Sequence, residues 1–347
     1  MKVLISLFSW ERNTLNLLGW GVLLLSLISC NQDPILETTN DYFITPTHFP
    51  ERVYQNENNV LNKEGIALGK KLFFDPILSI DSTISCGSCH SQDYAFADNG
   101  KPLSVGVRGQ IGIRNSPPLF NLAWYKNFMW DGGVKHLEFI PLAPIELDIE
   151  MDESIQNVIQ KLNRNIEYQN DFEAVFGTKE ISDKEFLFAM AQYMTALVSA
   201  DSKYDQMIQG ETTFSSEENR GYQLYQSECS SCHTEPLFTN SSFKNNGLDS
   251  VYSDLGRKRI TLNDADLGKF KVPSLRNLSY TYPYMHDGRF VSMEQVIEHY
   301  SKNILDSKTL SSELINKNFT AQEKADIVAF LKTLDDESFL TNMEYRP

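Results

Sequence analysis

The sequence is short of positive charge. It has 31 Lys and Arg residues against 46 Asp and Glu residues, a formal net charge of -15 over 347 residues. Nucleic acids select basic protein surfaces, so this deficit argues against a nucleic acid as the partner. The acidic excess instead favours solubility and attraction to partners that carry basic patches.

The N-terminal region lacks an apolar run long enough to cross a bilayer stably. Its run extends only from Leu17 to Ile28, whereas a transmembrane helix needs about 20 apolar residues. Lys2 and Arg12 precede this run and the small residue Ser29 follows it, which is typical of a secretory signal peptide. The segment therefore indicates export of the chain.

The end of this leader, LISC, resembles the lipobox of bacterial lipoproteins, in which the cysteine is lipidated. We expect residues 1–29 to be a signal peptide of the lipoprotein type, residues 30–50 a polar tether, and Cys30 the lipid anchor. A plain secretory signal or an uncleaved anchor is the alternative. Removal of Lys2, Glu11 and Arg12 with the leader takes away a net charge of +1, so the mature chain would carry -15 - 1 = -16.

Cysteine is scarce, and the pattern leaves none for a structural disulfide. Apart from Cys30, the four cysteines form two motifs, CGSCH at residues 86–90 and CSSCH at residues 229–233. In a helix, positions i, i+3 and i+4 share a face, so two thiols and an imidazole can meet one planar cofactor. The thiols add to the vinyl groups of haem, and the histidine becomes the iron ligand.

Covalent haem is the interpretation that these motifs favour. We expect one haem c on Cys86, Cys89 and His90 and a second on Cys229, Cys232 and His233, with both histidines bound to iron. A four-cysteine zinc site and dithiol redox chemistry are the alternatives. Either alternative would leave the two identically placed histidines as a coincidence.

Helix signals dominate from Val60 onward. Sustained period-two alternation is scarce, and apolar residues recur at helical spacing after several capping motifs. We therefore predict a mainly α fold with long loops at residues 91–121 and 234–290. Four Ser/Thr-x-x-Glu/Gln pairs predict helix starts: Ser182 with Glu185, Ser215 with Glu218, Ser292 with Gln295, and Thr320 with Glu323.

An internal repeat divides the chain. LGKKLFF before the first motif and RGYQLY before the second share Gly-x-x-Leu-aromatic. One repeat per domain predicts an N-terminal haem domain over residues 51–210 and a C-terminal haem domain over residues 211–347.

Eight segments in order resemble the bacterial dihaem cytochrome c peroxidases and their MauG-type relatives, between about residue 60 and residue 335. The resemblance implies two cytochrome c-like domains, each with one covalently bound c-type haem. The segments are LGKKLFFDPILS, CGSCHSQDYAFAD, IRNSPPLFN, FMWDGG, APIELDIEM, KVPSLRN, TYPYMHDG and VIEHY.

The resemblance also implies which residues surround the first haem. In many of these peroxidases a histidine in the loop after the first motif caps the iron, but SVGVRGQ has Val107 at that position. Valine cannot bind iron, so we expect this haem to be five-coordinate or to hold water in the resting ferric protein. Glu150 matches the distal carboxylate that moves a proton of peroxide, and Pro144 matches a residue that lines the same pocket.

Other positions carry over from the family's relay and calcium site. Trp130 matches the tryptophan that carries electrons between the two haems. Asn115, Thr281 and Pro283 match positions that bind calcium, largely through backbone carbonyls. Arg114 could face the site or a haem propionate, with a structural salt bridge as the alternative.

The sixth ligand of the second haem distinguishes two branches of the family. Typical members have a methionine fourteen residues after the histidine of HDG, and here that position is Tyr300, as in the MauG-type branch. An anionic phenolate should lower the reduction potential of the haem, whereas methionine would raise it. Four further residues are possible ligands: Met285, His286, Met293 and His299.

The resemblance implies a dihaem peroxidase. It would reduce hydrogen peroxide through high-valent haem iron, with electrons from an external donor such as a small c-type cytochrome. One alternative is MauG-like oxidation of a partner protein in quinone cofactor maturation, and another is a non-enzymatic dihaem electron carrier. Export and Cys30 predict a periplasmic, membrane-anchored lipoprotein.

Overall fold

The computed structural model describes residues 42–55, 58–98 and 100–347. The expected signal peptide and Cys30 lie outside the described residues. Within the described ranges, no helix is long and apolar enough to cross a membrane.

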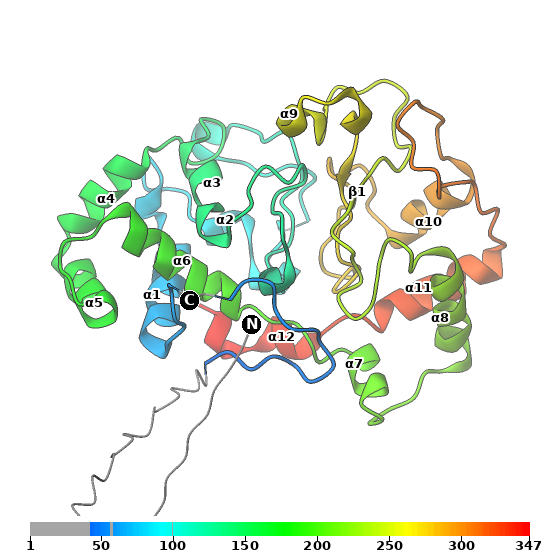
Figure 1. Cartoon of the computed structure of the whole chain (residues 1–347), viewed down its shortest axis with the longest axis horizontal. Helices are drawn as coiled ribbons and strands as arrows, with labels where there is room; N and C mark the ends of the chain where they lie inside the picture. The colour runs from blue at the N-terminus through cyan, green and yellow to red at the C-terminus, as the bar shows by residue number, and fades with distance from the viewer. Residues whose placement is uncertain (1–41, 56–57, 99) are drawn as a thin grey trace, which may run out of the picture. The chain divides into compact units, whose positions relative to one another are not determined.

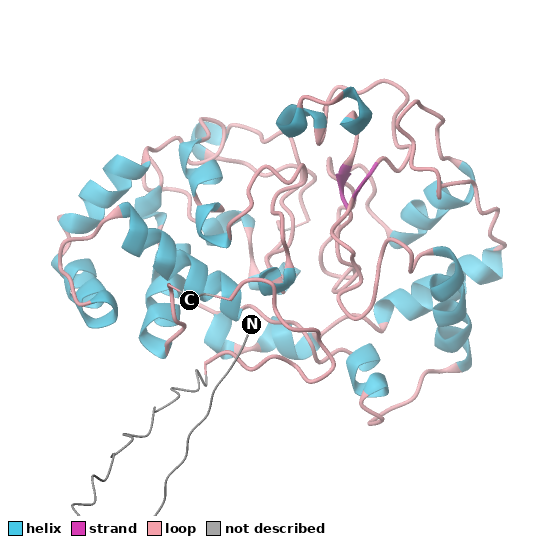
Figure 2. Ribbon diagram, in the orientation of Figure 1, coloured by secondary structure: helices cyan, strands magenta, loops and turns pink. Residues whose placement is uncertain are grey.

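Helices joined by long loops make up the described chain, as predicted (Figures 1 and 2). The two strands pair antiparallel, with Phe243 opposite Lys271 and Lys244 opposite Phe270. In chain order the elements are α1 (Lys63–Phe74), α2 (Cys86–Cys89), α3 (Leu142–Glu146), α4 (Ile155–Asn163), α5 (Ile166–Phe176), α6 (Asp183–Ala196), α7 (Lys203–Ile208), α8 (Ser216–Glu228), β1 (Phe243–Lys244), α9 (Lys258–Thr261), β2 (Phe270–Lys271), α10 (Met293–Lys302), α11 (Ala321–Lys332) and α12 (Glu337–Thr341).

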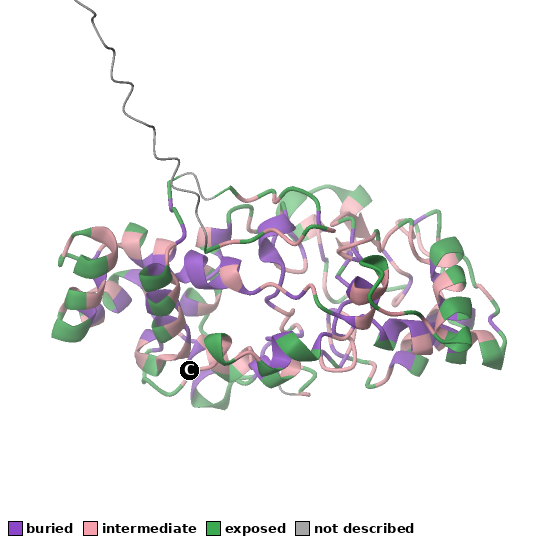
Figure 3. Cartoon of the chain, turned by 90° about the horizontal axis from the view of Figure 1, so that it is seen from below, coloured by how far each residue is buried: buried purple, intermediate pink, exposed green. Residues whose placement is uncertain are grey.

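Two apolar cores organise the helices. The first is built mainly around α1, α4, α5 and α6, and the second joins α8, α10 and α11. In Figure 3 the buried residues gather on the inner sides of the helices while exposed residues cover their outer sides. The helices that precede the two Cys-x-x-Cys-His motifs, α1 and α8, thus belong to different cores.

The glycines of the sequence repeat permit the closest helix crossings. A Cβ atom on Gly69 of α1 would lie 2.0 Å from the carbonyl oxygen of Ala189 in α6. A Cβ atom on Gly221 of α8 would lie 1.9 Å from the carbonyl oxygen of Asp326 in α11. Only glycine allows such contact, so the repeat encodes the same helix crossing twice.

The predicted caps lie at helix starts. Ser215 and Thr320 form complete capping boxes with Glu218 and Glu323. Ser292 accepts from the backbone amide of Gln295 at the start of α10. Ser182 differs, because its hydroxyl donates to the carboxylate of Glu185 and does not cap a backbone amide.

The end of the chain departs from the predicted domain boundary. Phe339 of α12 belongs to the first core, 5.7 Å from Phe96 and 5.9 Å from Phe120 between ring centroids. The amide of Gln92 donates to the carbonyl oxygens of Phe339 and Asn342. Residues after about 336 therefore pack with the N-terminal helices, because Phe339 is buried among the aromatic rings there.

The expected tether is also packed over its last residues. Phe49 is buried and makes an edge contact with Trp124 at 5.0 Å between centroids. The indole of Trp124 donates to the carbonyl oxygen of Pro50, and His48 bonds to Asp205. Residues 42–50, the end of the expected tether, are therefore held against the protein by aromatic side chains.

Candidate haem sites and the residues around them

The first Cys-x-x-Cys-His motif forms one turn of helix. Cys86 and Cys89 are the ends of α2, and the amide of His90 donates to the carbonyl oxygen of Cys86. The imidazole Nδ1 of His90 lies 2.7 Å from the carbonyl oxygen of Phe96. A carbonyl can only accept, so Nδ1 carries the proton and Nε2 keeps the lone pair that iron requires.

The second motif lies in a turn that follows α8 and makes corresponding hydrogen bonds. The amide of His233 donates to the carbonyl oxygen of Cys229, and its Nδ1 lies 3.2 Å from Phe238 O and 3.1 Å from Pro273 O. Burial lowers the pKa of His90, and it lowers the pKa of His233 to about 4. Both imidazoles are thus neutral at neutral pH, as iron ligands must be.

The thiols lie in the same apolar surroundings. Burial raises the pKa of Cys86 to about 12, of Cys89 to about 11 and of Cys229 to about 12. Redox-active dithiols have lowered pKa values, so these groups do not have the character of a catalytic dithiol.

Glu150 and Val107 lie together beside the first motif. The amide of Val107 donates to the carbonyl oxygen of Glu150 at 2.8 Å, and the Val107 side chain is fully buried. Pro144 is in the same turn, since its carbonyl oxygen accepts from the amide of Met151. Burial raises the pKa of Glu150, whose charge acts on the thiols of Cys86 and Cys89.

Trp130 connects loops from both halves of the chain. Its indole N–H donates to the carbonyl oxygen of Asn115 at 2.7 Å, and its own carbonyl oxygen accepts from the amide of Lys271 in β2. These two bonds hold the backbone and the ring in one orientation.

Lys271 was missed by the sequence analysis, although it lies in the KVPSLRN segment. Burial lowers its pKa to about 8, and no neighbouring carboxylate among the described residues opposes this shift. Its ammonium group lies 4.6 Å from the centroid of the Tyr125 ring. Lys271 is half-buried, so an anionic partner would offset the desolvation of its ammonium group, and a haem propionate near Trp130 would supply one.

Arg114 forms a structural salt bridge, which was the alternative to a contact with the site or a haem propionate. Its guanidinium makes two hydrogen bonds to Asp254, at 2.6 and 2.9 Å, and one to Asp131 at 2.7 Å. Asp131 follows Trp130 in the chain, so Arg114 supports the loop that carries the indole.

Tyr300 of α10 is half-buried and lies close to the second motif. Burial raises the pKa of its hydroxyl, while a hydrogen bond from Asn246 and the charges of Cys229 and Cys232 have smaller effects. The amide Nδ2 of Asn246 lies 3.3 Å from the Tyr300 hydroxyl and 3.5 Å from Met285 Sδ. Nothing in the sequence pointed to Asn246.

The other possible ligands of the second haem have different environments. His299 bonds through Nε2 to the carbonyl oxygen of Asn246 at 2.9 Å. Met293 packs in the second apolar core. His286 stacks on Phe270, with 3.7 Å between ring centroids.

The three expected calcium residues lie in loops that contact one another. The Asn115 amide N–H donates to His286 O, and Asn115 Nδ2 donates to Lys101 O at 3.3 Å and Pro102 O at 3.1 Å. Thr281 and Pro283 are buried in the segment that leads to His286.

Asp98, which lies just before Lys101 and Pro102 in the chain, was also missed by the sequence analysis. Its carboxylate is buried, and neither oxygen has a hydrogen-bond partner within the described ranges. The nearest ammonium, on Lys101, lies 3.9 Å away. A buried carboxylate that accepts no hydrogen bond is costly, and the Lys101 ammonium offsets its charge only from this distance.

These features define a c-type cytochrome with two histidine-containing haem sites. Residues 63–213 match the model of the di-haem cytochrome c peroxidase family, and residues 218–335 match that of cytochrome c. The chain is 36% identical over 295 residues to the methylamine utilization protein MauG of Methylorubrum extorquens, a match that covers 83% of each chain. It is also 36% identical over 280 residues to the cytochrome c551 peroxidase of Nitrosomonas europaea, covering 79% of this chain and 80% of that protein.

Solved structures agree with these matches. A MauG-like protein associated with microbial copper homeostasis superposes with a TM-score of 0.80 at 32% identity, covering 87% of this chain and 98% of that chain. The diheme peroxidase BthA of Burkholderia thailandensis shares the fold, with a TM-score of 0.72 at 21% identity over 83% of this chain and 91% of that chain.

The chain belongs to the di-haem cytochrome c peroxidase family. It is an oxidoreductase built from two cytochrome c-like domains, each with one covalently bound haem c. The prediction of a mainly helical dihaem peroxidase is confirmed, and the zinc, dithiol and simple electron-carrier alternatives lose their support.

Proposed function

We propose that the protein reduces hydrogen peroxide at the haem held by Cys86, Cys89 and His90, with electrons that enter through the second haem from an external donor. The observation that carries this proposal is the pairing of Val107 with Glu150. Val107 stands at the position where many family members have a blocking histidine, and its amide donates to the backbone carbonyl oxygen of Glu150, whose half-buried carboxyl has a raised pKa.

The residues of the first site have separate tasks. Haem, when bound, supplies the iron at which peroxide gains two electrons and, with two protons, becomes two waters. Glu150 takes the proton from one peroxide oxygen and delivers it to the departing oxygen. Pro144 and Val107 limit the water that reaches the Glu150 carboxyl.

Trp130 is proposed as the relay between the two haems. Its indole has a large oxidisable face, and its hydrogen bonds to Asn115 and Lys271 support a constant orientation. Lys271 is proposed to pair with a haem propionate beside it. The second haem is proposed on Cys229, Cys232 and His233, with Tyr300 as the sixth iron ligand.

The test is to mix fully ferric holoprotein with peroxide in a stopped-flow instrument. We expect a rapid spectral change without prior reduction, and a high-spin axial electron paramagnetic resonance signal before mixing. Val107→His should remove that signal and make the reaction depend on prior reduction, while Val107→Leu should keep both properties. A wild-type protein with two six-coordinate haems that ignores peroxide would contradict the proposal.

Calcium is proposed to bind at Asn115, Thr281 and Pro283. Carbonyl and amide oxygens suit this ion, and the buried Asp98 carboxylate, whose oxygens accept no hydrogen bond within the described ranges, would supply negative charge. We expect Asp98→Asn to weaken calcium binding at least about tenfold in a chelator competition, since one charged oxygen donor is lost. The exposed Asp93→Asn is the control, and equal affinities of the two variants would contradict the role of Asp98.

A second candidate function is oxidation of a partner protein, as in quinone cofactor maturation. The similarity to two proteins named MauG and the tyrosine at position 300 favour it. Cross-linking of peroxide-treated holoprotein to candidate quinoprotein precursors, followed by mass spectrometry of their side chains, would detect this activity.

We infer that the protein acts in the periplasm and is anchored by lipid at Cys30. The apolar leader and its LISC end support this. Mass spectrometry of the mature N-terminus would test it, because a lipidated protein starts at Cys30, and Cys30→Ser should release the protein from membranes.

A further inference from the structure

Asn246 contacts Tyr300 and Met285, two of the candidate ligands of the second haem. Its amide nitrogen is 3.3 Å from the Tyr300 hydroxyl oxygen and 3.5 Å from the Met285 sulfur. Its carbonyl oxygen accepts a hydrogen bond from His299 Nε2 at 2.9 Å. One residue thus contacts three of the five candidate ligands.

The neighbours of Asn246 hold it in place. Asn245 is 1% exposed, and its amide nitrogen lies 2.6 Å from the Tyr252 hydroxyl and 2.8 Å from the Thr309 hydroxyl. Gly247 adopts a positive φ of 70°, and its carbonyl oxygen accepts from the amide of Leu305. Because both flanking residues are tied to the segment after α10, the Asn246 amide has little freedom to turn away.

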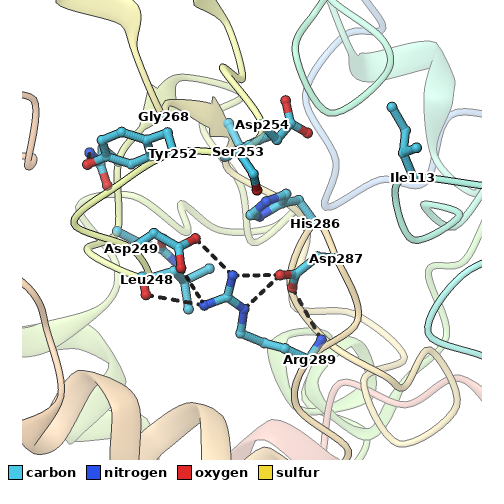
Figure 4. A pocket seen from close by; sticks show the side chains of 13 residues that line it. Ile113, Leu248, Asp249, Tyr252, Ser253, Asp254, Gly268, His286, Asp287 and Arg289 are labelled. Carbon is cyan, nitrogen blue, oxygen red and sulfur yellow. Dashed lines mark hydrogen bonds and ion pairs between the residues drawn. The ribbon is translucent and has the colours of Figure 1, made fainter.

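An ion-pair network joins the loop of Asn246 to the loop of Met285. Arg289 donates to both carboxylate oxygens of Asp249, at 3.0 and 2.8 Å, to the carbonyl oxygen of Leu248, and to Asp287 (Figure 4). These groups surround a cavity of about 70 Å³ that Asn246 also lines. The network thus ties the segment that follows Asn246 to the segment that follows Met285.

Met285 has an unusual backbone. Its φ of 75° lies in the left-handed region, which is costly for a long side chain and persists only where the surroundings impose it. Its sulfur contacts the Asn246 side-chain amide, so the thioether and the Tyr300 hydroxyl share one donor group.

We propose that Asn246 is the positioning residue for the sixth ligand of the second haem, holding the Tyr300 oxygen by a donated hydrogen bond and weakening its electron donation to iron. This inference rests on the proposed ligation by Tyr300. Hydrogen bonds to a ligand orient it and tune the potential of the metal. An amide is a donor at every accessible pH, so the hydrogen bond does not depend on protonation of Asn246.

The experiment compares holoprotein variants that carry both haems. Met285→Leu removes the competing sulfur and should leave the potential of the second haem and its low-spin resonance unchanged. Adding Asn246→Leu to this background should shift the oxidised-to-reduced ratio about tenfold toward the oxidised form, a fall of about 59 mV for a one-electron couple. The g values of the low-spin signal should change with it.

Two further variants separate a failure of the Asn246 role from a failure of Tyr300 ligation. Asn246→Ala should give the same fall in potential if Asn246→Leu fails to retain haem. Tyr300→Phe should lose the ligand, and if it keeps a six-coordinate second haem, the proposed ligation by Tyr300 fails. If Tyr300→Phe loses the ligand while the Asn246 variants keep the potential, or raise it, the positioning role of Asn246 alone is overturned. Loss of the low-spin signal in Met285→Leu would also overturn it.

Discussion

At the scale of single residues, Glu150 shows how a half-buried position changes the acidity of a carboxyl group. Burial raises its pKa above the ordinary value of 4.5, so its charged form is disfavoured in the pocket. The backbone carbonyl oxygen of Glu150 accepts a hydrogen bond from the amide of Val107. This bond connects Glu150 to the loop in which valine replaces the blocking histidine.

Glu150→Gln should lower the rate of the reaction with peroxide by roughly 10²- to 10⁴-fold, because an amide cannot take and return a proton. The wild-type rate should rise with pH through the raised pKa of Glu150, since the carboxylate is the active form, and the variant should lack this rise. Stopped-flow mixing at several pH values measures both effects. The exposed Asp148→Asn is the matched control, and a variant that keeps the pH dependence would show that another group titrates.

The sequence could predict only those site residues that lie in segments resembling the family. Glu150, Val107 and Tyr300 lie in segments whose order resembles the family, so their positions could be named in advance. Asn246 and Asp98 have no such signal, because their roles depend on contacts with loops far away in the chain. Lys271 was visible in its segment, but only the absence of a carboxylate partner among the described residues makes it notable.

At the scale of elements, the sequence repeat corresponds to two helix crossings. Gly69 brings α1 against α6, and Gly221 brings α8 against α11. The sequence before each Cys-x-x-Cys-His motif could be recognised as a repeat. The helix crossing that the repeat permits could not be predicted, because the helix that each glycine contacts lies about one hundred residues later.

Gly221→Ala should destabilise the protein by about 1 to 3 kcal/mol, since the new methyl group would overlap the carbonyl oxygen of Asp326 and force α8 away from α11. The better helix propensity of alanine would offset up to about 1 kcal/mol of this loss. Urea unfolding of the holoprotein followed by circular dichroism measures the change. Gln223→Ala, on the exposed side of the same helix, should have a negligible effect, and equal stabilities of both variants would argue against the close crossing.

At the scale of the whole molecule, the two ends of the described chain depart from the simple two-part plan. Residues 42–50 pack against Trp124 and Asp205, and α12 packs into the first core. Local patterns predicted the helices between these ends. They could not predict which core each end would join, because that choice depends on apolar contacts between distant residues such as Phe339 and Phe96.

Phe339→Ala should cost about 3 to 5 kcal/mol of stability, because a ring that is 2% exposed would leave a cavity between Phe96 and Phe120. The carbonyl of Phe96 holds the imidazole of His90, so the spectrum of the first haem should change as well. Thermal unfolding and absorbance of the holoprotein measure the two effects. Met343→Ala, at a side chain that is 73% exposed, should change neither, and an unaltered melting temperature in Phe339→Ala would refute the role of α12.

The net charge of -15 belongs to the molecule as a whole and bears on the choice of electron donor. An acidic protein attracts a donor with a basic patch, and such steering raises association rates by about 10- to 10³-fold at low salt. Salt screens this attraction, since the Debye length falls to about 8 Å at physiological ionic strength. We therefore expect kcat/KM for a basic donor cytochrome to fall roughly tenfold or more as ionic strength rises.

Steady-state turnover at several salt concentrations measures this dependence. The reaction of the protein with peroxide should stay constant, because peroxide is uncharged and no steering acts on it. An uncharged small-molecule donor provides the control and should be oxidised at a rate independent of salt. If the basic cytochrome behaved like the uncharged donor, or were oxidised faster at high salt, the acidic surface would have no part in donor recognition, and the donor would have to bind through apolar contacts.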